Sequence, residues 1–355
     1  MTEQRSDSSP TLRDVAVVAG VSPATASRAL NGSTRNVGEE KLSRVLQAAA
    51  KLGYVPNLSA QATARGSTKM VALVVHDIAD PYFSAIASGA IEGAEAAGLT
   101  VTMAVTDRSP DRELEIVSTL RGHRPHAIIL AGSRIGDDQD ALVEELRAYK
   151  AAGGRVAVVS QPGLPYGTVT IDNHRAAEDL ARALVAHGYR RFAVLRGPDD
   201  LRTSRDRSDG FVAGLAQAGI DVEAMVETDF TEDGGHLAMT ELLSRGLGGV
   251  DLVFAVNDVM AIGAMRALRD ADLVPGRDLA VAGFDDISAA TDVHPALTTV
   301  QVPMRAMGRH VIDLALAESD QGEVVWLPTS VVLRDSTPRR TSAPRGNVTP
   351  GSVRR

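Results

Sequence analysis

The chain has 355 residues, 44% of them hydrophobic, so it is long enough for two or three packed domains and too apolar to be disordered. It contains no cysteine, which excludes disulfides, thiolate metal sites and thiol catalysis, and no apolar run approaches the roughly 20 residues that span a bilayer. Residues 1–69 hold nine basic and five acidic side chains, a net charge of +4. The whole chain has a net charge of −8, so the remaining residues carry −12. This split favours contacts with phosphates by the N-terminal part alone.

Two short helices are predicted after the polar start. Thr11 is expected to cap the first helix, and Asp14, three residues later, completes a capping box. Gly20 allows the chain to turn, and Ser22 before a proline predicts a second helix over Pro23 to Leu30. Two helices joined by so short a turn form a helix-turn-helix unit, whose second helix enters the major groove of DNA.

A third helix and a short segment complete the N-terminal part. The third helix is predicted over Glu39 to Leu52 and ends at Gly53. The segment Asn57 to Arg65 is shorter than the roughly 12 residues that an isolated helix needs, so we expect it to become ordered only against a partner. The apolar stripe that would close a three-helix core consists of Leu42, Val45, Leu46, Ala49 and Leu52.

From Met70 the pattern changes to apolar strands that alternate with amphipathic helices. This alternation predicts parallel βαβ units with right-handed crossovers, and the remaining length suits two subdomains. The predicted strands are Val71 to Val75, Thr100 to Val105, His126 to Leu130, Val156 to Val159, Phe192 to Leu195, Leu252 to Val256 and Leu279 to Ala282.

The residues directly after these strands are candidates for a ligand site, because open α/β sheets bind ligands outside the carboxyl ends of their strands. They combine carboxylates, amides, hydroxyls, arginines and aromatic rings, which suits a polyhydroxylated or nucleoside-like solute. A structural role is the alternative at each position, for example a helix cap at Asn257 and Asp258 or a solvated charge at Arg205. The candidates are Asp77 to Phe83, which includes Ala79 and Tyr82, then Asp107, Ser133, Gln161, Arg205, Arg207, Phe230, Asn257, Asp258 and Asp285.

Both ends of the chain are expected to be disordered. Residues 1–10 are polar and are followed by no apolar stretch typical of a secretory signal, so we expect a cytoplasmic protein. Residues 338–355 are rich in proline, serine, threonine and glycine, with five arginines and no acidic residue. This composition predicts a disordered basic tail.

Several segments, taken in order, carry a family resemblance. They resemble successive signatures of the lactose-repressor (LacI/GalR) family of bacterial transcription regulators over about residues 11–337. The segments are TLRDVAVVAGVSPATASRALNG, VLQAAAKLGYVPN, ALVVHDIADPYFSAI, VFAVNDVMAIGAMRAL, VAGFDDIS and PALTTVQVPMRAMG.

The resemblance implies an all-α helix-turn-helix DNA-binding head joined to an α/β sensor similar to periplasmic binding proteins. The sensor would consist of two doubly wound parallel-sheet subdomains and would form the effector-binding and dimerisation domain. The implied limits are 11–56 for the head, 57–69 for a hinge helix and linker, and 70–337 for the sensor, with subdomain 1 at about 70–170 and 300–323 and subdomain 2 at about 172–298 and 326–337.

In the head, the resemblance assigns groove reading to Pro23, Ala24 and Arg28. Arg28 is the candidate for a bidentate contact to guanine, worth about 1–3 kcal/mol of discrimination, whereas Pro23 and Ala24 offer only apolar contact, for example with a thymine methyl group. The positions expected near phosphates or bases are Thr11, Leu12, Ser22, Thr25, Ser27 and Asn31.

The segment from Asn57 to Arg65 resembles the family's hinge helix, which in the dimer inserts a leucine into the minor groove. The matching position here is Thr63, and Gln61 stands where the family usually has arginine. Threonine is a poorer wedge than leucine, so the sequence does not decide whether the hinge kinks the DNA by apolar insertion. Ala60 and Ala64 are expected to pack against the partner chain.

In the sensor, the resemblance implies that an effector cleft lies between the subdomains. Arg207 would donate to ring and hydroxyl oxygens, and Asp285 would accept from hydroxyls. Ser160 and Gln161 replace an Asp-Arg pair common in the family, which predicts an effector different from the common sugars. The positions implied to line the cleft are Tyr82, Phe83, Arg207, Phe230, Asn257 and Asp285.

Two other functions fit the sequence less well than a DNA-binding regulator does. The sequence has no GxSxG elbow, no phosphate-binding GxxxxGK[ST] loop and no histidines at metal-ligand spacing, so we expect neither an enzyme nor a cofactor or metal. The sensor alone would suit a transporter's solute-binding protein. Such a protein requires export and has no use for a basic helical head.

The expected mechanism requires two heads, because one small helix-turn-helix contacts too little DNA for useful specificity. A homodimer built on the sensor would match a palindromic operator, most simply as a repressor. Effector binding would change the angle between the subdomains and so the spacing of the two hinge segments, with a coupling of about 1–3 kcal/mol.

Overall fold

The computed structural model describes residues 10–30, 37–55, 68–132, 139–317 and 322–340. The chain divides between Thr68 and Lys69 into two compact units, a small helical unit and a larger α/β unit. Each unit has a hydrophobic core of its own. Within the described ranges, every helix is too short or too polar to cross a membrane.

The helical unit has the three helices that the sequence predicts. The capping box is present at the start of the first helix: the Thr11 hydroxyl oxygen accepts a hydrogen bond from the Asp14 N–H (3.4 Å), and the Asp14 carboxylate accepts one from the Thr11 N–H (2.8 Å). The fully buried side chains of Val15, Ala26 and Val45, one from each helix, meet in the core. The helices are α1 (Leu12–Ala19), α2 (Pro23–Leu30) and α3 (Glu39–Leu52).

One member of the predicted stripe on α3 lies outside this core. Leu46 is 50% exposed, whereas Val45 is fully buried. Successive helix residues are about 100° apart, so a core centred between Val45 and Ala49 leaves Leu46 at the edge of the buried face. The predicted apolar stripe therefore included one residue, Leu46, that does not belong to the core.

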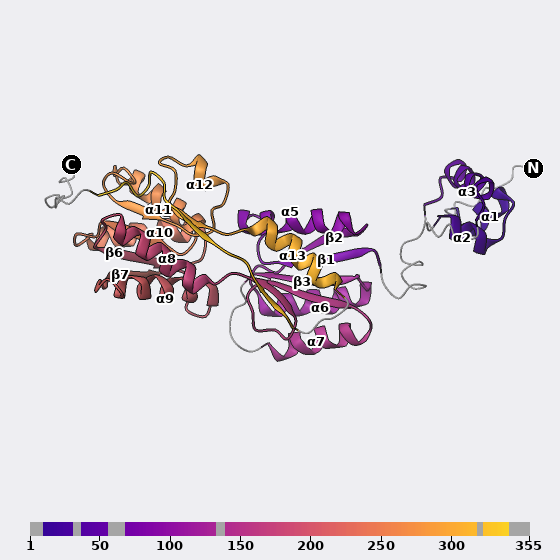
Figure 1. The fold of residues 1–355 in the computed structure, drawn as a ribbon, viewed down its shortest axis with the longest axis horizontal. Coiled ribbons are helices and arrows are strands. Elements are labelled where there is room, and N and C mark those ends of the chain that lie inside the picture. Colours follow the sequence, from indigo (N-terminus) through magenta and orange to yellow (C-terminus); the bar gives the residue numbers. More distant parts are fainter. Residues whose placement is uncertain (1–9, 31–36, 56–67, 133–138, 318–321, 341–355) are drawn as a thin grey trace, which may run out of the picture. The chain divides into compact units, whose positions relative to one another are not determined.

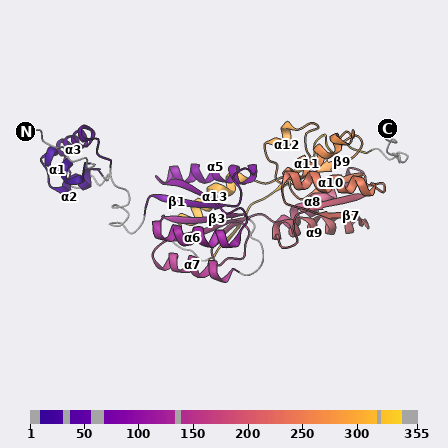
Figure 2. The same cartoon turned by 180° about the vertical axis from the view of Figure 1, so that it is seen from behind.

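The larger unit consists of two subdomains, each a parallel sheet between layers of helices (Figure 1). In subdomain 1 the strand order is β11-β5-β4-β3-β1-β2. Its strands are β1 (Met70–Val75), β2 (Thr100–Val105), β3 (Ala127–Gly132), β4 (Arg155–Ser160), β5 (Gly167–Thr170) and β11 (Val324–Trp326). One face of the sheet is covered by α5 (Pro81–Ala96) and α13 (Met304–Leu316), and the other by α6 (Pro110–His123) and α7 (Asp140–Ala151) (Figures 1 and 2).

Subdomain 2 repeats this arrangement with the strand order β7-β6-β8-β9. Its strands are β6 (Phe192–Arg196), β7 (Val222–Glu227), β8 (Leu252–Ala255) and β9 (Ala280–Ala282). Its helices are α8 (Asn173–Ala186), α9 (Arg202–Ala216), α10 (Glu232–Arg245), α11 (Asp258–Asp270) and the short α12 (Ala289–Asp292). The strand order reverses between β1 and β3 in one sheet and between β6 and β8 in the other, and such switch points are where doubly wound sheets bind ligands.

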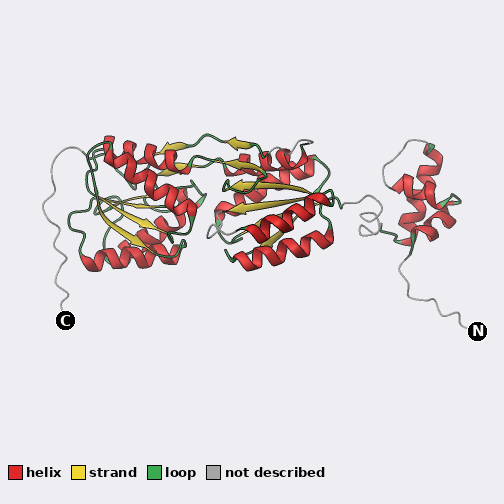
Figure 3. Ribbon diagram, turned by 90° about the horizontal axis from the view of Figure 1, so that it is seen from below, coloured by secondary structure: helices red, strands yellow, loops and turns green. Residues whose placement is uncertain are grey.

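The chain crosses between the subdomains three times. The first crossing follows β5, the second follows β10 (Thr299–Gln301), and the third joins β11 to β12 (Ser330–Val332). Strands β10 and β12 pair with each other in antiparallel register, so the second and third crossings are joined by backbone hydrogen bonds (Figure 3). The doubly wound fold predicted from the sequence is thus present, with an added ribbon between its halves.

The start of the predicted C-terminal tail is ordered. The Tyr189 hydroxyl donates to the carbonyl oxygen of Pro338 at 2.7 Å, and the Arg340 N–H donates to the carbonyl oxygen of His187 at 3.0 Å. The Arg340 guanidinium also pairs with Asp251. Residues 338–340, which composition assigns to the tail, thus form contacts with subdomain 2 in the structure.

Candidate functional site

The second helix of the head presents the side chains expected to read DNA. Pro23, Ala24 and Arg28 are exposed, whereas Ala26 and Ala29 on the opposite face are buried. The Arg28 Nε donates to the carbonyl oxygen of Ala24 at 3.2 Å, so the side chain runs back along the helix toward its start. In a helix-turn-helix this N-terminal part of the second helix is the part that contacts base edges.

The other predicted DNA contacts have structural roles in the head. The Ser22 Oγ accepts from the Thr25 N–H at 3.2 Å and lies 2.9 Å from the Thr25 hydroxyl, so these residues cap α2. Thr11 caps α1, Leu12 packs against the core, and Ser27 is half-buried. The predicted positions Asn31, Asn57, Ala60, Gln61, Thr63 and Ala64, and Ser133 in the sensor, lie outside the described residues.

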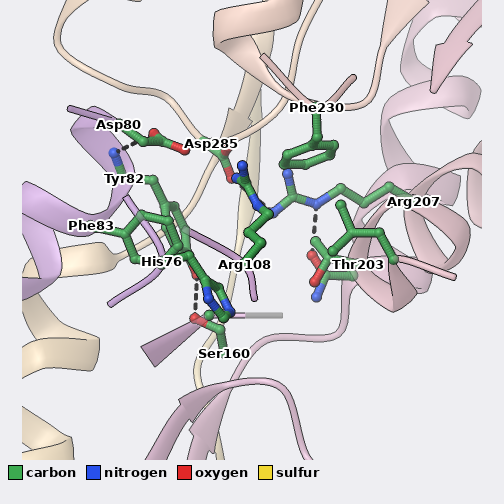
Figure 4. A pocket seen from close by; sticks show the side chains of 13 residues that line it. His76, Asp80, Tyr82, Phe83, Arg108, Ser160, Thr203, Arg207, Phe230 and Asp285 are labelled. Carbon is green, nitrogen blue, oxygen red and sulfur yellow. Dashed lines mark hydrogen bonds and ion pairs between the residues drawn. The ribbon is translucent and has the colours of Figure 1, made fainter. Parts of the chain in front are cut away.

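In the sensor a cavity lies where the carboxyl ends of the two sheets face each other (Figure 4). The free space left among its side chains is about 30 Å³. Subdomain 1 contributes His76, Asp80, Tyr82, Phe83, Arg108, Gly132 and Ser160. Subdomain 2 contributes Asn173, Leu201, Thr203, Arg207, Phe230 and Asp285.

Arg207 is the centre of a buried polar network in this cavity. Its Nη2 donates to the Asp285 carboxylate at 2.8 Å, and both residues are at most 5% exposed. Its Nε donates to the Asn173 side-chain oxygen at 2.8 Å, and its Nη1 donates to the Val256 carbonyl oxygen at 2.9 Å. Burial raises the pKa of Asp285, and the adjacent guanidinium opposes that rise. The network fixes two hydrogen-bonding side chains in place before any ligand arrives.

The backbone of the cavity wall is held in conformations that favour glycine. Ser160 has φ of 88° and Asp285 has φ of 123°. Strain of this kind persists only where the surrounding structure holds the backbone in place. Here the Asp285 N–H donates to the carbonyl oxygen of Val300 at 3.0 Å, and the Val302 N–H donates to the carbonyl oxygen of Asp285 at 3.2 Å. Such strained residues gather at ligand sites more often than elsewhere.

Aromatic rings and hydroxyls supply the rest of the wall. The Tyr82 hydroxyl lies 2.7 Å from the Ser160 hydroxyl, and burial raises the pKa of Tyr82 to about 12, so it keeps its proton and can donate. The Tyr82 and Phe83 rings meet edge to face with centroids 5.3 Å apart. Phe230 lies on the opposite side, in the loop before α10.

The structure brings six of the predicted effector residues together in this cavity: Asp80, Tyr82, Phe83, Arg207, Phe230 and Asp285. Among the other predicted residues, Ala79, Asp107, Gln161, Arg205 and Asn257 do not line it.

Local contacts or exposure explain where the predicted residues outside the cavity lie. Asn257 is buried and caps α11, with its side-chain oxygen accepting from the Met260 N–H at 2.9 Å. Asp107 pairs with Arg112 on α6. Arg205 and Ala79 are exposed, and Gln161 is buried beside the cavity residue Ser160 rather than in its wall.

Sequence reasoning missed several residues of the cavity. Helix geometry could have found Thr203, because it precedes Arg207 by four residues and so shares its face, whereas Arg205 points to the other side. His76 and Ser160 directly neighbour predicted positions. No pattern in the sequence marks the remaining missed residues, which are Arg108, Gly132, Asn173 and Leu201.

Comparisons with known proteins match both units. A family model described as bacterial regulatory proteins, lacI family, matches residues 11–57, and one described as a periplasmic binding protein-like domain matches residues 181–337. The HTH-type transcriptional regulator CelR of Thermobifida fusca is 32% identical over 92% of this chain and 98% of its own length.

Two solved structures resemble the chain over nearly its whole length. A complex of the transcriptional regulator CelR with cellobiose has a TM-score of 0.68 and 31% identity, covering 92% of this chain and 99% of that one. The lac repressor dimer bound to operator and the anti-inducer ONPF has a TM-score of 0.80 and 28% identity, covering 93% of this chain and 100% of that one. These matches are to transcriptional regulators, which supports the regulator over the transporter alternative. This chain belongs to the lacI family of bacterial helix-turn-helix transcriptional regulators.

Proposed function

We propose that this protein is a dimeric repressor whose affinity for a palindromic operator is set by a small polyhydroxylated effector, a sugar or a nucleoside-like solute, bound in the interdomain cavity. The observation that carries the proposal is the wall of that cavity, in which both subdomains contribute a polar group fixed in place and an aromatic ring. Mostly apolar walls with a few convergent polar groups are typical of small-molecule sites.

Within the cavity the roles follow from the donor and acceptor chemistry. Asp285 accepts from effector hydroxyls, and the N–H groups of Arg207 that the network leaves over donate to effector oxygens. Tyr82 and Phe230 pack against the ring faces, one from each subdomain. An effector that touches both walls favours one angle between the subdomains, which gives it the differential affinity that allostery requires.

In the head, Arg28 supplies the polar contact to a base, and Pro23 and Ala24 supply an apolar contact. Arg28 is exposed on the face of α2 that its buried alanines leave to solvent. Two such helices, presented by the two chains of a dimer, would fit half-sites about one helical turn apart.

The first experiment identifies both partners with the full-length protein. Selection from random DNA gives the operator, and a thermal-shift screen of sugars, polyols and nucleosides gives the effector. An effector at 100 times its Kd is expected to raise the free energy of unfolding by about 2.7 kcal/mol. A palindromic consensus sequence and a stabilising solute are the expected results.

Two substitutions then separate the sites. Arg28→Ala is expected to reduce preference at one base pair of the operator by about fivefold to 150-fold while leaving effector affinity unchanged. Arg207→Ala removes the centre of the cavity network, so it is expected to abolish effector binding while operator affinity without effector persists. Arg112→Ala, in an exposed ion pair on α6, is the control that keeps both activities. Equal loss of both activities in either test variant would contradict the proposed division.

A further inference from the structure

Arg108 enters the cavity because of an unusual turn. It lies between β2 and α6, where Asp107 and Arg108 both adopt left-handed backbone conformations, with φ of 52° and 58°. Neither residue is a glycine, so each incurs a steric cost in this region. The turn sends the Asp107 carboxylate outward to Arg112 on α6, whereas Arg108 becomes part of the cavity wall.

The Arg108 side chain spans the cavity from one subdomain to the other. Its guanidinium carbon lies 5.5 Å from the centroid of the Phe230 ring, which is within the range of a cation–π interaction. Figure 4 shows Arg108 amid the labelled side chains, between Tyr82 of subdomain 1 and Arg207 of subdomain 2. The contact therefore links the β2–α6 turn of subdomain 1 to the loop before α10 of subdomain 2.

The positive charge of Arg108 acts to lower the pKa of Asp80, but the hydrogen bonds of the other charged groups go to other partners. Arg207 donates to Asp285, and the Asp80 carboxylate caps α5 by accepting from the Tyr82 N–H at 3.0 Å. Within the described part of the chain, Arg108 forms no ion pair, and its guanidinium faces the Phe230 ring instead. With these side chains in place, little free space is left among them, about 30 Å³, and Arg108 faces the Phe230 ring.

We propose that Arg108 and Phe230 form a latch that holds the cleft closed while it is empty, and that an effector must displace Arg108 from the Phe230 ring in order to bind. This inference rests on the proposed function, because the face of Phe230 that Arg108 covers is the surface on which an effector ring would pack. Arg108 then acts as an internal competitor. It weakens effector binding and limits the motion of the subdomains in the free protein.

The test uses the effector-free, full-length protein. Since the natural chain contains no cysteine, Glu115→Cys on α6 and Asp209→Cys on α9, both exposed, provide two specific labelling positions, one on each subdomain. Single-molecule energy transfer between the labels reports the ratio of closed to open molecules. Arg108→Ala is expected to lower that ratio about twofold to thirtyfold, the range for loss of one cation–π contact.

A double-mutant cycle and a control identify the contact responsible. Phe230→Leu is expected to give the same shift as Arg108→Ala, and the double variant no more than either, because both remove one interaction. Arg112→Ala, which alters the same turn's exposed ion pair, is expected to leave the distribution unchanged. An Arg108→Ala distribution identical to that of the parent, or additive shifts in the double variant, would overturn the latch.

This result stands apart from the proposed effector site. The energy-transfer measurement needs no effector, so it decides the latch whether or not a sugar or nucleoside binds. Circular dichroism and the thermal midpoint of each variant establish that it is folded. Failure of the effector screen would count against the proposed function and would leave the measured latch in place.

Discussion

Asp258 is a fully buried carboxylate at the first position of α11, next to the effector cavity but outside its wall. Its Oδ1 accepts from the Thr299 hydroxyl at 2.6 Å and its Oδ2 from the Ile287 N–H at 3.0 Å. These bonds do not fully offset the loss of hydration, and burial raises its pKa to about 6. The carboxylate ties α11 to β10, the strand that begins the return to subdomain 1.

This raised pKa predicts a pH dependence of stability. The folded protein binds the Asp258 proton more tightly than the unfolded chain, so this group's contribution to stability is fully present below about pH 4 and is lost as the pH rises through about 6. The loss amounts to about 3 kcal/mol. Asp258→Asn cannot ionise, so its stability relative to the parent is expected to improve between pH 4 and pH 7 in urea unfolding. A difference that stays constant with pH would contradict the assignment.

Individual site residues were predictable where local geometry follows from the sequence. Arg207 and Asp285 stand out because buried strands and one helix face position them. Asp107 and Arg108 could not be distinguished, because two left-handed residues in succession decide which of them faces the cavity. Asn257 shows the converse difficulty, since an asparagine after a strand serves equally well as a ligand or as a helix cap.

At the scale of elements, α5 and α13 pack backbone to backbone although more than 200 residues separate them in the sequence. A Cβ at Gly89 would overlap the carbonyl oxygen of Arg305, and one at Gly308 would overlap the carbonyl oxygen of Ile86. Glycines on the two facing surfaces therefore permit the close approach. The contact fixes α13, which the second crossing leads into, on the sheet of subdomain 1.

Gly89→Ala is accordingly expected to destabilise the sensor. The added methyl group must separate the two helices, at a cost of about 1–3 kcal/mol that exceeds the roughly 1 kcal/mol gained in helix propensity. The midpoint of urea unfolding should fall. Gly122→Ala is the matched control, because Gly122 lies in α6 with nothing within 4 Å of an added Cβ, and its midpoint should stay the same or rise. Equal urea midpoints for the two variants would show that α5 and α13 can separate without loss of stability.

Helices were easier to predict than the shortest strands. The helices of the head carry caps and apolar stripes that mark their ends, and their bounds agree with the prediction. Strands β10, β11 and β12 have three residues each, too few to show a period, and their pairing depends on contacts with distant segments. β7 was missed because it is an edge strand whose residues alternate in burial without a continuous apolar run.

At the scale of the whole molecule, the division into two units with separate cores predicts independent stabilities. Val45 is fully buried in the head, and Val45→Ala removes two methyl groups there at a cost of about 2 kcal/mol. Because so small a domain has little stability to lose, operator binding should fall steeply, while the main calorimetric transition of the sensor stays unchanged. A parallel drop in the sensor transition would show that the two units unfold together.

The three crossings between the subdomains have a topological consequence. Each subdomain is assembled from chain segments on both sides of its neighbour, so cutting the backbone at one crossing separates no folded body from the rest. A nick after β5 would leave two polypeptides that still pair through β5 and β11, while the β10–β12 ribbon lies wholly in the second polypeptide. The sheet of subdomain 1 therefore depends on strands that lie before and after subdomain 2 in the chain, so subdomain 2 cannot be removed as one C-terminal piece without taking β11 from that sheet.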